Sequence, residues 1–400
     1  MAAATAESQP PRSRPRHRRA EIAKNAGELF STRGFHAVRM DDIAEASGIT
    51  ARALYRHYEN KQALLSHVVR EDQQRVIETL TALSEQAADE RSLDASLTAL
   101  TNAALDSRQL SLLWQREARH LDADDYRLVR RQTRWIAKQF EELLIGSERD
   151  DLDESAADIR SWVVVSIVSG PGLYDSALSR QRLAQDLVAA SKRVISEPAA
   201  VTADEPDGDE TSRTSLSRRE QLIYAGARAF RAKGFGGINI DDIGGQLSIV
   251  GPALYRYFDN KAEILVAAVN RLHEWLALEM TRAMRTPCPD EAVLAQLIQG
   301  YIRIALEATD LLAVSLTERL YLPPAVSERF DRIQADYIAE WQRWLSVARP
   351  ELSDARAATL VKAAKTIIDD CVRIPHLRQY QVLPAELLRV ALATLGLQHG

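Results

Sequence analysis

The sequence predicts an all-α fold made of two tandem copies of one unit, each with a small head and a larger helical body. Apolar residues recur at spacings of three and four in long segments of Ala, Leu, Glu, Arg and Gln, as in amphipathic helices. Alternating strand patterns are nearly absent, and the one β-branched run, residues 162–168, is interpreted as a buried helix because helical patterns flank it. Residues 26–65 recur as residues 226–265 at a constant offset of 200, which indicates a repeated module.

The repeat consists of identical residues held in one register without a gap. The shared positions, numbered in the first copy, are Phe30, Gly34, Phe35, Asp41, Asp42, Ile43, Ile49, Ala53, Leu54, Tyr55, Arg56, Asn60 and Lys61. Chance does not hold a register over so long a stretch, so the two halves are copies of one unit.

Composition limits the class of protein. The chain has 400 residues, of which 46% are apolar and 27% charged, as in a soluble protein of several domains. No segment approaches the roughly 18 apolar residues of a membrane helix, and the N-terminal arginines are not followed by the apolar run of a secretory signal. Two cysteines are too few for a disulfide framework or a metal cluster. We therefore expect a cytoplasmic protein with no membrane segment, metal or cofactor.

Catalytic signatures are also absent from the sequence. It has no glycine loop for phosphate, no strand-embedded nucleophile motif and no metal-binding motif, so we expect no enzyme. The charge pattern indicates a binding function instead. The chain carries a net charge of −5, yet residues 12–70 hold twelve Lys or Arg against six Asp or Glu, and residues 213–271 hold nine against five. Two basic segments on an acidic body favour contact with phosphate.

Composition and the repeat divide the chain into six segments. Residues 197–216 are rich in Pro, Ala, Asp, Glu, Thr and Gly, lack large apolar residues, and are interpreted as a flexible linker. The segments are a disordered basic tail at 1–17, a head at 18–65, a body at 66–196, the linker at 197–216, a second head at 217–265 and a second body at 266–400.

Each head has the pattern of a helix-turn-helix. In the first copy an amphipathic helix over residues 18–32 ends at Gly34, and a short helix follows from about Met40 to Ala46. A tight turn at residues 47–49 leads to Thr50, which is placed to cap a third helix over residues 51–58. The short helix of the second copy has Asn239 as its cap, where the first copy has Arg39, a poorer cap.

This pattern predicts a helix that enters the major groove of DNA while its neighbour braces it across the backbone. The outward positions of the first copy carry hydrogen-bond donors: Thr50, Arg52, Tyr55, Arg56 and His57. The inward positions, which hold the helix pair together, are Ile43, Ile49, Leu54 and Tyr58.

The residues Gly34-Phe35, Asp42-Ile43-Ala44, Gly48-Ile49-Thr50, Leu54 through Tyr58 and Lys61 resemble the N-terminal domain of TetR/AcrR-type regulators, and the second copy is similar to the same domain. The resemblance covers about fifty residues of each half. It implies a three-helix DNA-binding head on a helical body that holds a ligand pocket and packs through its last two helices. It also implies that Tyr55, His57 and Lys61 contact phosphates, with Thr50 and Arg52 nearest the bases. The corresponding residues in the second head are Val250, Pro252, Tyr255, Tyr257 and Lys261, and its candidate DNA contacts also include Gly251 and Arg256.

The two heads differ at the positions nearest the bases. Thr50 is replaced by Val250, which removes the cap hydroxyl, and Arg52 is replaced by Pro252, which cannot donate a hydrogen bond. We therefore expect the second head to read less base identity, with Val250 favouring thymine methyl groups. The arginine-rich tail is interpreted either as an arm for the minor groove or as a solubilising extension.

The bodies offer weaker signals. Candidate ligand contacts are Trp114, Glu117, Trp135, Trp162 and Glu318, although packing in the core is the preferred interpretation of each tryptophan. Asp369 and Asp370 are interpreted as a solvated turn in preference to a metal pair. We expect a repressor that binds a double-stranded DNA operator and is released by a small, apolar effector. Its two halves form an intramolecular pseudo-dimer through helices near 155–195 and 353–398; the alternative is a homodimer with four heads.

Overall fold

The computed structural model of the chain describes residues 15–87, 90–146, 148–149, 151–200, 217–249 and 253–398. These residues form helices joined by turns, with no strand among them, which confirms the predicted all-α fold. Residues 162–168 lie within a helix, as expected. In the described part of the chain, no helix has the length and apolar character that crossing a lipid bilayer requires.

The first half has a head of three helices and a body of six. The head contains α1 (Pro15–Arg33), α2 (Met40–Ala46) and α3 (Ala51–Leu54). The body contains α4 (Lys61–Ser84), α5 (Leu93–Asp106), α6 (Arg108–Glu117), α7 (Ala123–Phe140), α8 (Glu154–Ser169) and α9 (Arg180–Ser196). Single turns follow α6, α7 and α8 at Ala118–His120, Glu141–Ile145 and Gly170–Gly172.

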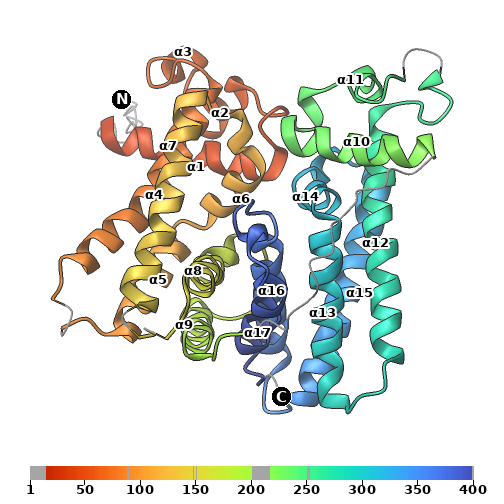
Figure 1. The fold of residues 1–400 in the computed structure, drawn as a ribbon. Helices are drawn as coiled ribbons and strands as arrows, with labels where there is room; N and C mark the ends of the chain where they lie inside the picture. Colours follow the sequence, from red (N-terminus) through yellow and green to blue (C-terminus); the bar gives the residue numbers. More distant parts are fainter. Residues whose placement is uncertain are drawn as a thin grey trace, which may run out of the picture.

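The second half follows the same order except at the counterpart of α3, part of which lies outside the described residues. Its head contains α10 (Arg218–Lys233), a turn at Phe235–Gly237 and α11 (Ile240–Gly245). Its body contains α12 (Lys261–Arg285), α13 (Val293–Glu307), α14 (Thr309–Thr317), α15 (Pro324–Ala348), α16 (Asp354–Cys371) and α17 (Leu383–Leu395), with turns at Asp290–Ala292, Arg319–Tyr321 and Leu377–Gln379. The two heads lie at the same end of the molecule, and the bodies extend away from it (Figure 1).

Helix starts follow local capping chemistry. The Asn60 side chain accepts the Ala63 N–H at 2.8 Å to begin α4, and Asn260 does the same for Glu263 at 3.1 Å to begin α12. Asn239 and Asp242 form a reciprocal capping box at the start of α11, whereas in the first head only the Asp42 carboxylate contributes, accepting the Arg39 N–H at 2.7 Å. The expected difference between the two caps is thus present.

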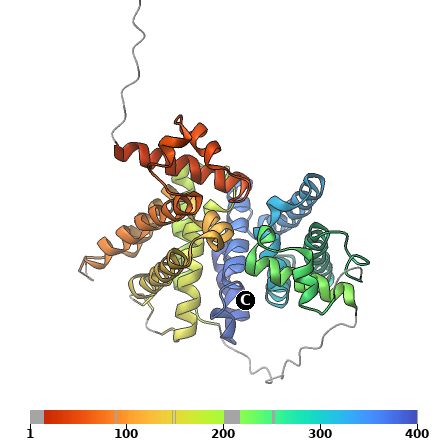
Figure 2. The same ribbon diagram turned by 90° about the horizontal axis from the view of Figure 1, so that it is seen from above.

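The halves join through α8, α9, α16 and α17, which lie at the centre of both views (Figures 1 and 2). Inside this four-helix interface, Arg160 of α8 pairs with Glu386 of α17 at 2.6 Å, and both side chains are fully buried. The offset of 200 persists here as well. Arg149 donates to the Ile195 carbonyl at 3.0 Å and Arg349 to the Leu395 carbonyl at 2.9 Å.

Two boundaries differ from those expected. Helix α1 begins at Pro15, so residues 15–17 belong to it and not to the tail, of which residues 1–14 lie outside the described residues. Helix α3 ends at Leu54, because the N–H groups of Arg56 and His57 bond to carbonyls three residues back and tighten the chain into a turn. Of the expected linker, residues 201–216 lie outside the described residues.

The first four residues of the expected linker are held in place. Arg160 donates to the carbonyls of Glu197 and Pro198, the latter at 2.9 Å, and the Ala200 N–H donates to Glu386 at 2.8 Å. The same buried ion pair that joins the halves therefore also anchors the chain that leaves α9.

Candidate DNA interface and ligand cavity

The first head presents a helix-turn-helix with a buried inner face. Gly48 adopts a left-handed φ of 62° in the turn between α2 and α3. The Thr50 hydroxyl then accepts the Ala53 N–H at 3.2 Å and caps α3, as expected. Ile43 and Leu54 are fully buried and Tyr58 nearly so, which fixes α3 against the rest of the head.

The outward residues of the first head are solvent-accessible. Thr50, Arg52, Tyr55 and Arg56 are exposed and His57 is partly exposed, with 53% of Tyr55 accessible. No other part of the described chain covers them. They lie on α3 and the turn that follows it, at the outer end of the molecule in Figure 1.

The second head is similar over the part that the structure describes. Tyr255, Arg256 and Tyr257 are exposed, with accessible fractions of 46% for Tyr255 and 40% for Tyr257. Val250, Gly251 and Pro252 lie outside the described residues. At the position of Gly48 stands Ser248, which keeps a positive φ of 56° despite its side chain.

Lys61 and Lys261 have structural partners that sequence reasoning missed. The Lys61 ammonium donates to the Phe35 carbonyl at 2.6 Å and the Val38 carbonyl at 2.8 Å, and it lies 4.3 Å from the Phe35 ring centroid. Lys261 repeats this arrangement with Phe235 and Ile238. Burial lowers the pKa of both lysines. Each therefore ties the turn after the first head helix to the start of the body, which leaves one N–H for a phosphate.

A cluster of charged residues joins the heads to the bodies and the halves to each other. The Glu117 carboxylate lies beside the turn at Gly34 and Phe35. In the second half the Phe235 N–H donates to Glu318 at 3.0 Å, and Arg119 of the first half pairs with Glu318 at 2.6 Å. Glu117 and Glu318 are thus equivalent residues, each holding the turn that leads into its head.

The two heads also touch at this junction. A Cβ added at Gly236 would lie 2.7 Å from the His36 ring, so the second head packs closely on the first. His36 and His120 lie edge to face with centroids 4.4 Å apart, and His120 stacks on Phe35. Burial, with Lys61 and Arg119 nearby, lowers the pKa of His120 to about 4.

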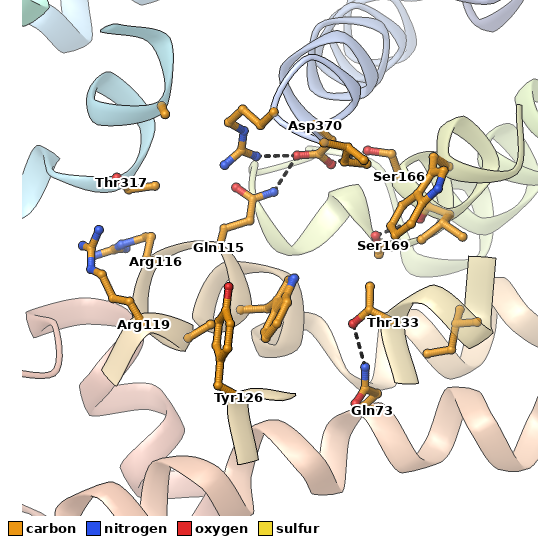
Figure 3. Close-up of a pocket in the computed structure, with 18 of the residues that line it drawn as sticks. Gln73, Gln115, Arg116, Arg119, Tyr126, Thr133, Ser166, Ser169, Thr317 and Asp370 are labelled. Atoms are coloured by element: carbon orange, nitrogen blue, oxygen red, sulfur yellow. Dashed lines mark hydrogen bonds and ion pairs between the residues drawn. The ribbon is translucent and has the colours of Figure 1, made fainter. Parts of the chain in front are cut away.

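A cavity of about 770 Å³ lies in the first body, beneath its head. Its walls come from α4, α5, α6, α7 and α8, and the second half completes it with residues of α10, α14 and α16 (Figure 3). Apolar side chains form one part: Val76, Trp114, Ile136, Phe140, Trp162, Val165 and Val168. Arginines contributed by both halves form another: Arg116, Arg119, Arg231 and Arg373.

The ligand candidates proposed from sequence divide into three groups. Trp114 and Trp162 line the cavity. Trp135 is 38% exposed on α7 and does not line it. Glu117 and Glu318 are buried at the junction and do not line the cavity. The cavity arginines Arg116, Arg119, Arg231 and Arg373 were not among the residues predicted from sequence.

Asp369 and Asp370 do not form a solvated turn, contrary to the expectation. Helix α16 continues to Cys371, which places both carboxylates against the interior. Asp370 accepts bonds from Gln115 and Arg373, both at 2.7 Å, and burial raises its pKa. Among the described residues no cluster of His, Cys, Asp and Glu is arranged to hold a metal ion.

The second body carries larger or charged side chains at positions equivalent to cavity-lining residues of the first. On α8 the cavity-lining residues include Val165 and Ser169, and 200 positions later α16 carries Lys365 and Asp369, which pair at 2.7 Å. Tyr301 donates to Asp369 at 2.5 Å and packs edge to face on Trp341, with centroids 5.5 Å apart. The two bodies have therefore diverged in their interiors.

Comparison with known proteins agrees with the geometry of the heads. The family described as bacterial regulatory proteins of the tetR family matches residues 22–68 and 222–268. The HTH-type transcriptional repressor KstR2 of Mycolicibacterium smegmatis is 36% identical over 59 residues, or 15% of this chain and 29% of that protein. The HTH-type transcriptional regulator UidR of Escherichia coli is 35% identical over 71 residues, or 18% of this chain and 33% of that protein. The chain thus spans about a third of the length of these relatives.

Among solved structures, the ketosteroid transcriptional regulator KstR2 of Mycobacterium tuberculosis aligns with a TM-score of 0.37 and 21% identity, covering 44% of this chain and 92% of that one. The two family matches are 200 residues apart; the first contains α2 and α3 of the first head, and the second contains α11 of the second head. This chain therefore carries, in tandem, two copies of the module by which the tetR family of bacterial regulatory proteins is recognised.

Proposed function

We propose that this protein is a sequence-specific transcriptional regulator, a repressor that a small molecule releases from its operator, and that its two heads are not equivalent. One observation carries the proposal: the two segments that match the tetR family lie at the same end of a single chain, with exposed donors on each (Figure 1). Such donors suit phosphates and base edges in the major groove.

The heads would divide their contacts by position. Tyr55 and His57 reach phosphates, while Arg52 and Thr50 face the bases at the start of α3. The second head keeps Tyr255, Arg256 and Tyr257 for the backbone, but Val250 and Pro252 replace the two base-facing donors. The operator is therefore an imperfect palindrome, with stronger base preference in the half-site of the first head.

One chain would serve as the dimer that helix-turn-helix proteins normally form. Helices α8, α9, α16 and α17 are already paired within the chain, and their contact includes the buried ion pair of Arg160 and Glu386. A homodimer with four heads is the competing arrangement and requires a further surface.

The effector would bind in the first body, where the cavity of about 770 Å³ suits a small organic molecule. Release follows by linkage if the effector binds more tightly to a spacing of the heads that does not fit successive major grooves. The second body, whose corresponding region holds Tyr301, Lys365 and Asp369, would bind no second effector.

A gel-shift assay with DNA from the protein's own promoter tests the central function. A regulator binds this DNA in preference to a scrambled duplex, and its affinity falls steeply with salt because phosphate contacts release counterions. Equal affinity for both duplexes, or no binding at low salt, would overturn the proposal. A promoter-reporter fusion separates repression from activation by the sign of the change when the protein is removed.

A further inference from the structure

The cavity of the first body has an excess of positive charge in its wall. Four arginines line it, namely Arg116, Arg119, Arg231 and Arg373, whereas Asp370 is the one carboxylate among its lining residues in the described chain. A wall of this composition favours a ligand with a negative charge.

Two of the four arginines are already neutralised. Arg373 donates to Asp370 at 2.7 Å, and Arg231 pairs with Asp310 at 2.7 Å. Gln115 donates to Asp370 as well, as drawn in Figure 3. These residues form a satisfied network that needs no ligand.

Arg116 and Arg119 are incompletely satisfied. Arg116 donates to the Ser31 carbonyl at 3.1 Å, but its buried Nη2 has no partner. Arg119 pairs with Glu318 through Nη1, while its buried Nε has no partner. Both guanidinium groups line the cavity, so their positive charge and their remaining N–H donors make this end of it a place for an anion.

The apolar part of the cavity lies away from these arginines. Figure 3 shows Arg116 and Arg119 on one side, facing Thr317, while Gln73 and Thr133 lie on the other. Ile136 and Phe140 follow Thr133 along α7 and line the cavity, and Trp162 comes from the neighbouring α8. A ligand that fills the cavity would meet cations at one end and hydrocarbon at the other.

We propose that the cavity binds an amphipathic organic anion, whose acidic group lies between Arg116 and Arg119 and whose apolar body packs against Ile136, Phe140 and Trp162. This inference rests on the proposed function in one respect, that the cavity is the effector site. It narrows the expected class of effector from an apolar molecule to one with an apolar body and an acidic group, such as a carboxylate or sulfonate.

The same geometry gives the ligand a route to the second head. Glu318 is fully buried and shares its carboxylate between Arg119 and the Phe235 N–H, which begins the turn into the helix-turn-helix. An anion beside Arg119 competes with Glu318 for that cation. Binding therefore weakens the link between the first body and the second head.

A matched pair of fluorescent probes tests the ligand class directly. Anilinonaphthalene sulfonate and N-phenylnaphthylamine share their ring system, and only the first carries an anionic group. Titrated into the full chain, the sulfonate should bind at least about tenfold more tightly, the size expected from charge-assisted hydrogen bonds. Equal affinity for the two probes would overturn the proposal without any variant.

Variants then locate the anion. Arg116→Gln should weaken binding of the sulfonate about tenfold and leave the neutral probe unchanged. Arg130→Gln is the matched control, because Arg130 is exposed on α7 and does not line the cavity. Glu318→Gln should strengthen binding of the sulfonate, since the amide keeps a hydrogen bond to Phe235 and releases Arg119. Equal losses in Arg116→Gln and Arg130→Gln, or unchanged affinity in Glu318→Gln, contradict the assignment.

These measurements contain no DNA and so separate the two proposals. Selective binding of the sulfonate with no operator binding would refute the regulatory function and keep the ligand site. Operator binding with no preference between the probes would refute the ligand class and keep the regulatory function.

Discussion

Replacing Glu386 by Gln should destabilise the protein by about 3–5 kcal/mol, the cost of leaving a buried cation without its counter-charge. Arg160 and Glu386 have no accessible side-chain surface, and their contact is 2.6 Å long. The other acceptors of the Arg160 guanidinium are neutral backbone carbonyls of residues 195, 197 and 198. The glutamine keeps the shape of the side chain and the bond to the Ala200 N–H, so the change isolates the charge.

Urea denaturation followed by circular dichroism measures the loss. Arg356→Gln is a suitable control, since it removes an ion pair with Asp186 in the same interface, but Arg356 is 30% exposed and its loss should stay within about 1 kcal/mol. The double variant Arg160→Gln, Glu386→Gln should recover part of the stability, because no unpaired charge remains and the amides can still hydrogen-bond to the neighbouring carbonyls and to the Ala200 N–H. A loss below about 1 kcal/mol in Glu386→Gln, or a double variant no more stable than the single one, would refute this reasoning.

Three further predictions follow from the heads and their junction. Gly48→Ala should lower the free energy of unfolding by about 1 kcal/mol through the positive φ alone, because a Cβ there meets no atom. Gly245→Ala, at an equally open but helical position, should cost no stability, and Ser248→Gly should stabilise the protein. Thermal melting measures all three. Because the pKa of His120 is lowered to about 4, the folded state binds fewer protons than the unfolded chain and loses stability as pH falls from 6.5 toward 4. Between pH 7 and pH 5 the melting temperature should fall less for His120→Phe than for the wild type. Equal falls for the two proteins would contradict this. Arg52→Ala should lower operator affinity by about 1–3 kcal/mol if Arg52 reads a base, whereas an equal loss on all sequences would indicate a phosphate contact.

The heads could be predicted from sequence because their signals are local. Asn239 against Arg39, Thr50 before α3 and glycine at position 48 each act on neighbours within a few residues, and each has the expected role in the structure. The length of α3 was wrong, since the chain tightens after Leu54 through bonds that no side chain signals. The partners of Lys61 were missed because its carbonyl acceptors lie more than twenty residues earlier.

The cavity and the junction depend on contacts between the halves, which sequence spacing does not reveal. Asp370 reads as a polar residue near a helix end, and only the packing of α16 on α8 and α6 shows it to be buried among Gln115, Ser166 and Arg373. One sequence pattern did extend into the bodies. The repeat continues beyond the heads in Arg149 and Asp151 against Arg349 and Glu351, which form equivalent pairs at the two ends of the interface.

Light scattering of the protein with its operator duplex tests the central claim most directly, since it counts the chains that supply the heads. Our account predicts a free protein of 44.6 kDa and a complex that contains one chain for each duplex. A free mass near twice that value, or two chains on one operator, would show that the paired heads of a single chain are not the DNA-binding unit.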